Sequence, residues 1–214
     1  MTFHPEPGTF AMRFTPGAFA GSPCLFLDRD GVVVEETNYL HRIDDVRFIP
    51  GVAQAVARIN AAGLPVVMVT NQAGIGRGYY SWSEFMAVQQ HIYDHYAQHG
   101  AHFDMVLACA YHEDGREPYA VARHPWRKPE PGMLLHAAGH LQVDLPQSYI
   151  VGDAATDLRA GQAAGLAAGA MVLTGHGQRE WQAVDEDQLL RWSGSGFKAS
   201  RQPDAAHAIA AWRP

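Results

Sequence analysis

The sequence has few cysteines, no basic stripe and no long apolar run. Two cysteines in 214 residues are too few for a disulfide framework, and Cys24 opens an apolar segment typical of a buried, inert thiol. The first 23 residues contain no stretch apolar enough for a signal peptide or a membrane span. A net charge of −6 with scattered arginines argues against nucleic-acid binding. We therefore expect a cytoplasmic protein that binds neither nucleic acid nor membrane.

Short apolar runs instead alternate with helical patterns along the chain. This alternation predicts an α/β fold, in which crossover helices cover a mostly parallel sheet whose strands are buried on both faces. The predicted strands cover residues 24–27, 66–69, 105–109, 149–151 and 170–173. Residues 1–23 are expected to form an N-terminal arm ahead of a single domain over residues 24–214. The sequence leaves open whether this arm packs on the domain.

The predicted helices follow from apolar residues spaced three and four apart. One begins at a capping box formed by Ser81 and Glu84 and stops before Gly100. Another starts at Pro131, which suits the first turn of a helix. The remaining helices are predicted over residues 52–59, 155–164 and 203–212, with a last strand near Phe197.

Four polar clusters directly follow predicted strands or the loops after them. In an open parallel sheet the carboxyl ends of the strands share one edge, where ligands bind. Each cluster alone is typical of a turn, a helix cap or a solvated surface. Their joint placement favours a single site at that edge. The clusters are Asp28-Arg29-Asp30-Gly31, Thr70-Asn71-Gln72, Arg127-Lys128-Pro129 and Gly152-Asp153.

The converging residue types are those of phosphoryl transfer. Asp28 and Asp30 point to the same side of an extended chain, and with Asp153 they place three carboxylates together. Such a cluster favours a bound cation, and oxygen ligands select a hard one such as magnesium. Lys128 and the Thr70 hydroxyl can hold phosphoryl oxygens, while one carboxylate attacks phosphorus and its neighbour moves the proton.

Asp157 lies one helical turn after the last carboxylate of this cluster. It can face the same site, or it can serve as an ordinary acidic residue in the first turn of a helix. The sequence does not separate these two interpretations.

The motifs in residues 27–31, 69–75, 127–133 and 151–157 resemble those of the haloacid dehalogenase superfamily. Within it they are similar to the D-glycero-D-manno-heptose 1,7-bisphosphate phosphatases, relatives of the histidinol-phosphatase domain. The resemblance implies a Rossmann-like three-layer sandwich with a mostly parallel sheet and without a separate cap domain. It implies Asp28 as nucleophile, Asp30 as general acid and base, and Thr70 and Lys128 on the phosphoryl group. Magnesium would be held by Asp28, the backbone carbonyl of Asp30, and Asp153.

The same resemblance implies a phosphoric monoester hydrolase acting on a small sugar phosphate, with the heptose bisphosphate as leading substrate. The enzyme is expected to act as a monomer. The residues expected to bind substrate are Arg29, Glu36, Thr37, Asn38, Tyr39, Asn71, Gln72, Ala73 and Arg127.

The loop after the third predicted strand departs from the family pattern. The family carries a structural zinc on Cys-x-His followed by Cys-x-Cys, whereas this chain has Tyr111 and Trp126 at two of those places. Cys109, His112 and His124 offer three ligands at most, and a closed structural site takes four. We therefore expect no structural zinc, with aromatic packing of Tyr111, Tyr119 and Trp126 in its place. Whether the three residues retain any zinc binding stays open.

A second departure is Ala154, where many of these enzymes have lysine. Its effect falls on how a distal phosphate is held, so other substrates stay open: histidinol phosphate, a nucleotide or another sugar phosphate. A non-catalytic phosphate-binding module is a rival of another class, disfavoured because all five catalytic positions are present. A mutase or phosphotransferase is a third, disfavoured because no cap excludes water.

Overall fold

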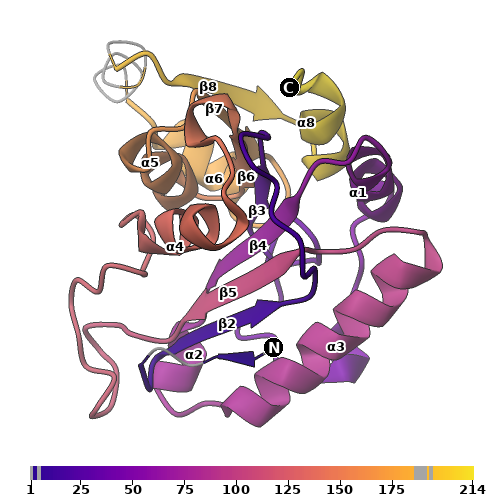
Figure 1. Ribbon diagram of the computed structural model, residues 1–214. Helices are drawn as coiled ribbons and strands as arrows, with labels where there is room; N and C mark the ends of the chain where they lie inside the picture. The colour runs from indigo at the N-terminus through magenta and orange to yellow at the C-terminus, as the bar shows by residue number, and fades with distance from the viewer. Residues whose placement is uncertain (1, 4–5, 186–191, 193–194) are drawn as a thin grey trace.

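The strands of the described residues form one sheet of eight strands. The computed structural model describes residues 2–3, 6–185, 192 and 195–214 (Figure 1). The strand order is β1-β2-β5-β4-β3-β6-β7-β8; β1 and β2 run antiparallel to their neighbours, and all other pairs are parallel. The strands are β1 (Thr2–Phe3), β2 (Thr9–Arg13), β3 (Leu25–Leu27), β4 (Val66–Asn71), β5 (Met105–Cys109), β6 (Tyr149–Gly152), β7 (Ala168–Val172) and β8 (Lys198–Gln202).

Helices cover both faces of the sheet. Figure 1 shows α1, α3 and α8 on one side of the strands and α4, α5 and α6 on the other. The helices are α1 (Val52–Ala61), α2 (Ala73–Gly76), α3 (Trp82–Gln98), α4 (Gly132–Leu141), α5 (Ala155–Ala163), α6 (Gly177–Gln182) and α8 (Ala205–Ala211), with short 3-10 helices η1 (Ile43–Asp45) and η2 (Leu145–Gln147). None of the helices described is long and apolar enough to cross a membrane.

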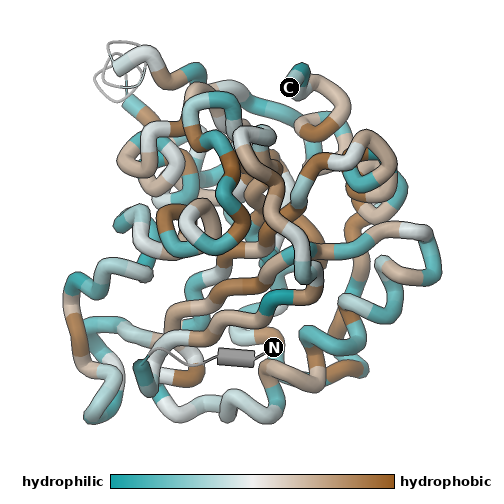
Figure 2. Tube along the Cα trace, in the orientation of Figure 1, coloured by the Kyte–Doolittle hydropathy of each residue, from teal (hydrophilic) through white to brown (hydrophobic). Residues whose placement is uncertain are grey.

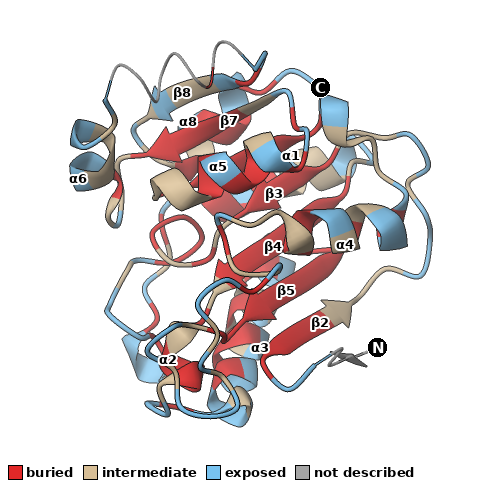
Figure 3. Cartoon of the chain, turned by 90° about the vertical axis from the view of Figure 1, so that its left-hand side faces the viewer, coloured by how far each residue is buried: buried red, intermediate tan, exposed pale blue. Residues whose placement is uncertain are grey.

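Two hydrophobic cores result, one on each face. Neighbouring strand residues point to opposite faces, so Leu25 and Leu27 enter the core under α1, α3 and α8, whereas Phe26 enters the core under α4 and α5. Strands β3 and β5 are accordingly apolar and buried at every position (Figures 2 and 3). The predicted α/β sandwich is confirmed, and the five predicted strands are observed with shifts of one or two residues at their ends.

The sheet topology places a ligand crevice at β3. From β3 the chain first builds outward through β4 and β5, and then returns to add β6, β7 and β8 on the other side. Such a reversal leaves a gap between the loops that follow the two diverging strands. The loops after β3 and β6 therefore carry the residues best placed to reach a ligand.

The N-terminal arm extends the sheet. β2 pairs antiparallel with β5, and β1 in turn pairs with β2. The sequence left open whether this arm packs on the domain, and the strand pairing answers that point. It also missed the strands themselves, because five residues with two polar ends make too short a pattern to identify.

The capping box at the start of α3 is observed as predicted. The Glu84 N–H donates to Ser81 Oγ at 3.3 Å, and the Ser81 N–H donates to Glu84 Oε2 at 2.7 Å. Both groups would otherwise lack a partner in the first turn of the helix. The short helices α2 and α6 were not predicted, since four and six residues give too little periodicity.

Candidate active site

Three carboxylates meet where β3 and β6 end. Asp28 follows β3, Asp153 follows β6, and Asp157 lies in the first turn of α5. One oxygen of each lies within 4.8 Å of the others, and across the described ranges no other group of three histidine, cysteine or acidic residues comes this close. The predicted convergence of Asp28 with Asp153 is therefore observed, and Asp157 joins them.

Lys128 forms ion pairs with two of these three carboxylates. Its Nζ lies 2.9 Å from Asp28 Oδ1 and 2.6 Å from Asp157 Oδ1, and it donates to the Val69 carbonyl at 2.8 Å. Burial alone would lower the pKa of Lys128, but the two carboxylates raise it overall. The lysine is thus a fixed positive charge, and Asp157 is one of the groups that orient it.

Asn71 fixes the backbone that carries this lysine. Its side-chain amide donates to the Lys128 carbonyl at 3.0 Å, and its oxygen accepts the Lys128 N–H at 3.0 Å. Because Asn71 ends β4, the loop holding Lys128 is tied directly to the sheet. The sequence had assigned Asn71 to substrate binding; the structure adds this second task.

The clustered carboxylates resist ionisation. Burial raises the pKa of Asp28 to about 7; Lys128 opposes the rise, and Asp157 and Asp30 add to it. Burial also raises the pKa of Asp153 to about 8, with further contributions from Asp28 and Asp157. A cation between these oxygens would remove the repulsion that the single lysine leaves.

The surroundings of Asp153 fit a bound hard cation. A Cβ placed on Gly31 would lie 2.3 Å from Asp153 Oδ2, and one on Gly175 would lie 2.2 Å from it. Any side chain at either position would therefore clash with the carboxylate. The His176 N–H donates to the same oxygen at 2.8 Å. Oxygen donors held in place in this way suit magnesium.

Asp30 was predicted as the third carboxylate of this cluster and is not a member of it, because two partners hold its side chain elsewhere. Arg29 donates to its carboxylate through Nε at 3.1 Å and through Nη2 at 3.0 Å, and the Gln72 amide donates to Oδ2 at 3.1 Å. Gln72 also donates to Thr70 Oγ1 at 2.7 Å. Arg29 is 1% exposed and lies 5.4 Å from the ring centroid of Phe85, so its guanidinium serves chiefly to orient Asp30.

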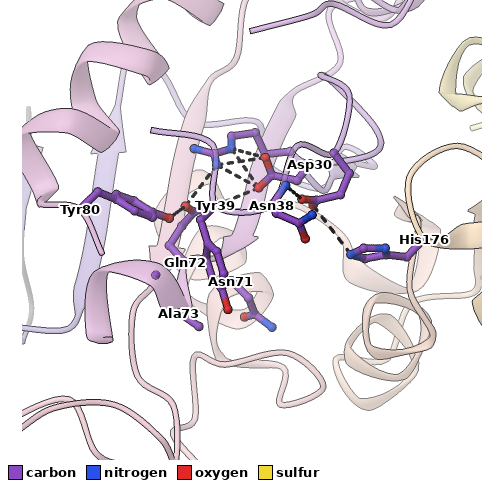
Figure 4. A pocket seen from close by; sticks show the side chains of 11 residues that line it. Asp30, Asn38, Tyr39, Asn71, Gln72, Ala73, Tyr80 and His176 are labelled. Atoms are coloured by element: carbon purple, nitrogen blue, oxygen red, sulfur yellow. Dashed lines mark hydrogen bonds and ion pairs between the residues drawn. The ribbon is translucent and has the colours of Figure 1, made fainter. Parts of the chain in front are cut away.

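A pocket of about 210 Å³ opens beside Asp30 (Figure 4). Seven of the residues expected to bind substrate line it; Thr37 and Arg127 do not. Thr37 is exposed on the loop after β3, and Arg127 donates to the Tyr111 carbonyl at 3.2 Å. The lining residues are Arg29, Asp30, Glu36, Asn38, Tyr39, Asn71, Gln72, Ala73, Gly74, Tyr80 and His176.

Sequence reasoning missed three of these lining residues. The Tyr80 hydroxyl donates to Gln72 Oε1, and Gly74 brings the backbone of α2 against the rings of Tyr80 and Tyr39. His176 lies across the opening, with Nε2 4.0 Å from Glu36 Oε2 (Figure 4). His176 comes shortly after β7, so the rule that ligand-binding residues follow strand ends could have found it.

The loop that follows β5 is held by aromatic and polar contacts. The Tyr111 ring stacks on His124 at a centroid distance of 4.1 Å, and Cys109 Sγ lies 3.8 Å from His124 Nδ1. His112 lies apart from this pair, 3.6 Å from Asp114 and next to Arg77. Cys109, His112 and His124 are thus not gathered around one point.

The comparisons with known proteins agree on one family. A HAD-hydrolase-like family model matches residues 125–189. A D-glycero-beta-D-manno-heptose-1,7-bisphosphate 7-phosphatase from Mesorhizobium japonicum is 47% identical over 174 residues, 80% of each chain. Among solved structures, a HAD-like phosphatase from Mesorhizobium loti matches with 46% identity and a TM-score of 0.77, covering 79% of this chain and 81% of that one. The magnesium and phosphate complex of D,D-heptose 1,7-bisphosphate phosphatase from B. bronchiseptica matches with 30% identity and a TM-score of 0.73, covering 88% and 96%.

Proposed function

Because this chain belongs to the heptose-1,7-bisphosphate phosphatase family of HAD-like hydrolases, we propose that it removes one phosphate from D-glycero-D-manno-heptose 1,7-bisphosphate. The observation that carries the proposal is the position of Asp28. This carboxylate lies at the topological switch of the sheet, paired with Lys128 and adjacent to Asp153. A nucleophile, a cation for the phosphate and a metal site thus share one crevice.

Asp28 acts as the nucleophile. Lys128 Nζ at 2.9 Å and the Arg29 N–H at 2.7 Å both contact Asp28 Oδ1, which fixes the orientation of the carboxylate. Its attack on phosphorus forms an aspartyl phosphate and breaks the bond to the sugar oxygen. Lys128 and the Thr70 hydroxyl hold the phosphoryl oxygens, since Gln72 donates to Thr70 Oγ1 and leaves the hydroxyl hydrogen to be donated.

Asp30 moves the protons of both steps. It donates a proton to the departing sugar oxygen, and then takes one from the water that attacks the aspartyl phosphate, which releases phosphate and regenerates Asp28. Arg29 and Gln72 hold its carboxylate at the edge of the substrate pocket, where the leaving group lies. Asp28, the Asp30 carbonyl and Asp153 would hold magnesium, which would supply Lewis-acid stabilisation of the phosphoryl charge.

The sugar binds in the pocket beside Asp30. Glu36 and Asn38 offer acceptors and donors for hydroxyl groups, and the Tyr39 ring offers a flat apolar surface. Arg127 does not line this pocket, and we propose that it contacts the part of the substrate that extends beyond the pocket. We further propose that the enzyme acts as a monomer in the cytoplasm, without a structural zinc.

Another phosphorylated metabolite is the second candidate substrate. Ala154 favours this candidate, because many of these enzymes carry lysine at that position. Without the positive charge of the lysine side chain, a distal phosphate is bound less tightly.

A screen of phosphorylated metabolites with magnesium tests the proposal. The heptose bisphosphate should give the highest kcat/KM among bisphosphorylated and monophosphorylated sugars, nucleotides and histidinol phosphate. Asp28→Asn serves as the control for contaminating phosphatase in every assay. A higher kcat/KM for another compound would replace the substrate and leave the reaction type; no magnesium-dependent turnover of any compound would refute the phosphatase itself.

A further inference from the structure

Residues 6–13 connect the outer edge of the sheet to the loop after β5. β2 pairs with β5 from Thr9 opposite Cys109 onward, and the Ala110 N–H donates to the Gly8 carbonyl at 2.8 Å. Phe10 stacks on Trp82 of α3 at a centroid distance of 5.7 Å. β2 is therefore anchored to both β5 and α3, and the residues just before it lie beside the loop.

A turn at the start of this strand presents Glu6 to the loop. The Glu6 N–H donates to Thr9 Oγ1 at 3.0 Å, and the Thr9 N–H donates to the Glu6 carbonyl at 3.0 Å. The Glu6 carboxylate then lies 3.1 Å from His124 Nε2 and 3.4 Å from the Tyr111 hydroxyl. One acidic side chain of the arm thus contacts two residues of the loop.

The hydrogen bonds of His124 assign its tautomer. The Trp126 N–H donates to Nδ1 at 3.1 Å, so Nδ1 is an acceptor and Nε2 carries the hydrogen that it donates to Glu6. Tyr111 stacks on the same ring. Tyr111 also contacts the arm: a Cβ on Gly8 would lie only 2.5 Å from the Tyr111 ring. Both nitrogens and one face of the imidazole are thereby engaged.

His124 and Tyr111 lead directly to the phosphate-binding segment. The Arg127 N–H donates to the His124 carbonyl at 2.9 Å, and the Arg127 guanidinium donates to the Tyr111 carbonyl at 3.2 Å. Lys128 is the next residue. We infer that residues 6–9 of the arm are a built-in staple: Glu6 fixes His124 and Tyr111, and through them positions Arg127 and Lys128.

Glu6 is thus a positioning residue, and its effect on phosphate binding rests on the proposed function. The Glu6 carboxylate contacts His124 and Tyr111, and Gly8 packs against the Tyr111 ring, at the place where the family carries its zinc. The chain closes the loop with its own N-terminal segment.

Amide hydrogen exchange in the full-length protein tests the staple without any assay of activity. In Glu6→Ala the Trp126 and Arg127 amides should exchange about three- to tenfold faster, the range expected for losing one hydrogen bond. Glu6→Gln should restore the wild-type rates, because its amide oxygen still accepts from Nε2–H. Glu117→Ala, which removes an exposed acidic residue of the same loop, should leave them unchanged.

Phosphate binding gives a second readout. Inorganic phosphate should inhibit the Glu6→Ala enzyme about three- to tenfold more weakly, with KM raised more than kcat is lowered. Wild-type exchange rates in Glu6→Ala would overturn the inference, as would Glu6→Gln exchanging as fast as Glu6→Ala. Faster exchange in a protein that hydrolyses no phosphate ester would instead uphold the staple and reject the proposed function.

Discussion

The carboxylate cluster and the loop after β5 are held by different forces, although they meet at Lys128. The cluster depends on charges: Asp28, Asp153 and Asp157 lie within 4.8 Å of one another beside a single buried lysine. The loop depends on stacked rings and on hydrogen bonds to both nitrogens of His124, one of them to the half-exposed Glu6 carboxylate. Removing one charged residue from a buried cluster leaves its partner unpaired, which is strongly destabilising. Removing one residue from a packed loop costs less, because many weak contacts share the stabilisation.

The largest expected effect comes from the nucleophile. Asp28→Asn should abolish turnover, because an amide does not attack phosphorus, while the similar size of the side chain should preserve the fold. Steady-state kinetics measure the loss, and circular dichroism with a thermal melt serves as the folding control. Near-normal rates in this variant would rule out the aspartyl-phosphate mechanism.

The neighbouring carboxylate should matter less. Asp30→Asn keeps the backbone carbonyl assigned to magnesium and loses proton transfer, so kcat should fall by ~10²–10⁴. Because Asp28 is intact, a rapid-quench experiment should still find phosphorylated enzyme with a substrate whose leaving group needs no protonation. Equal losses for good and poor leaving groups would contradict the assignment of Asp30 as the acid.

The sequence predicted most of what the sheet edge brings together. Strand ends are marked by short apolar runs followed by polar residues, so Asp28, Thr70 and Asp153 could be placed from the sequence, and Lys128 was placed after the loop that follows the third predicted strand. The role of Asp157 could not be resolved, because a helix's first turn accepts acidic residues with or without a partner.

The substrate pocket was predicted less completely, for a physical reason. The positions of His176 and Tyr80 depend on loop conformation, and both residues are far in sequence from Asp30, which they share the pocket with. No local periodicity encodes such contacts. Thr37 is the opposite case: it was expected to bind substrate together with its neighbours in the loop after β3, and its side chain is exposed to solvent.

The charge cluster also predicts a pH dependence that the loop should not share. In the metal-free fold the pKa values of Asp28 and Asp153 are raised from 3.8 to about 7 and about 8. Stability from these groups is therefore fully present below pH 4 and is lost as the pH rises through 7 to 8. Magnesium replaces the protons, so it should raise the melting temperature more at alkaline than at acid pH.

Thermal melts with and without magnesium across that pH range measure this difference. Asp153→Asn removes one titrating carboxylate and should flatten the dependence. A magnesium effect that is the same at every pH would contradict the assignment of the cation to this cluster.

The smallest effect is expected in the aromatic loop. Trp126 packs against His136 of α4 at a centroid distance of 4.6 Å and is only partly buried, so Trp126→Ala should lower the unfolding free energy by about 1 kcal/mol. The substitution should weaken inhibition by phosphate because the loop carries Arg127 and Lys128, and it should leave the magnesium dependence of turnover unchanged.

Elemental analysis of the wild-type protein should find well under one zinc per chain, and zinc chelators should not shift its melting temperature. The reason is ligand chemistry: Tyr111 and Trp126 are not ligands of ordinary structural zinc sites, and both nitrogens of His124 already have hydrogen-bond partners. Stoichiometric zinc on Cys109, His112 and His124 would refute this prediction. To bind one ion, the three side chains would have to leave their present hydrogen-bond partners and move together.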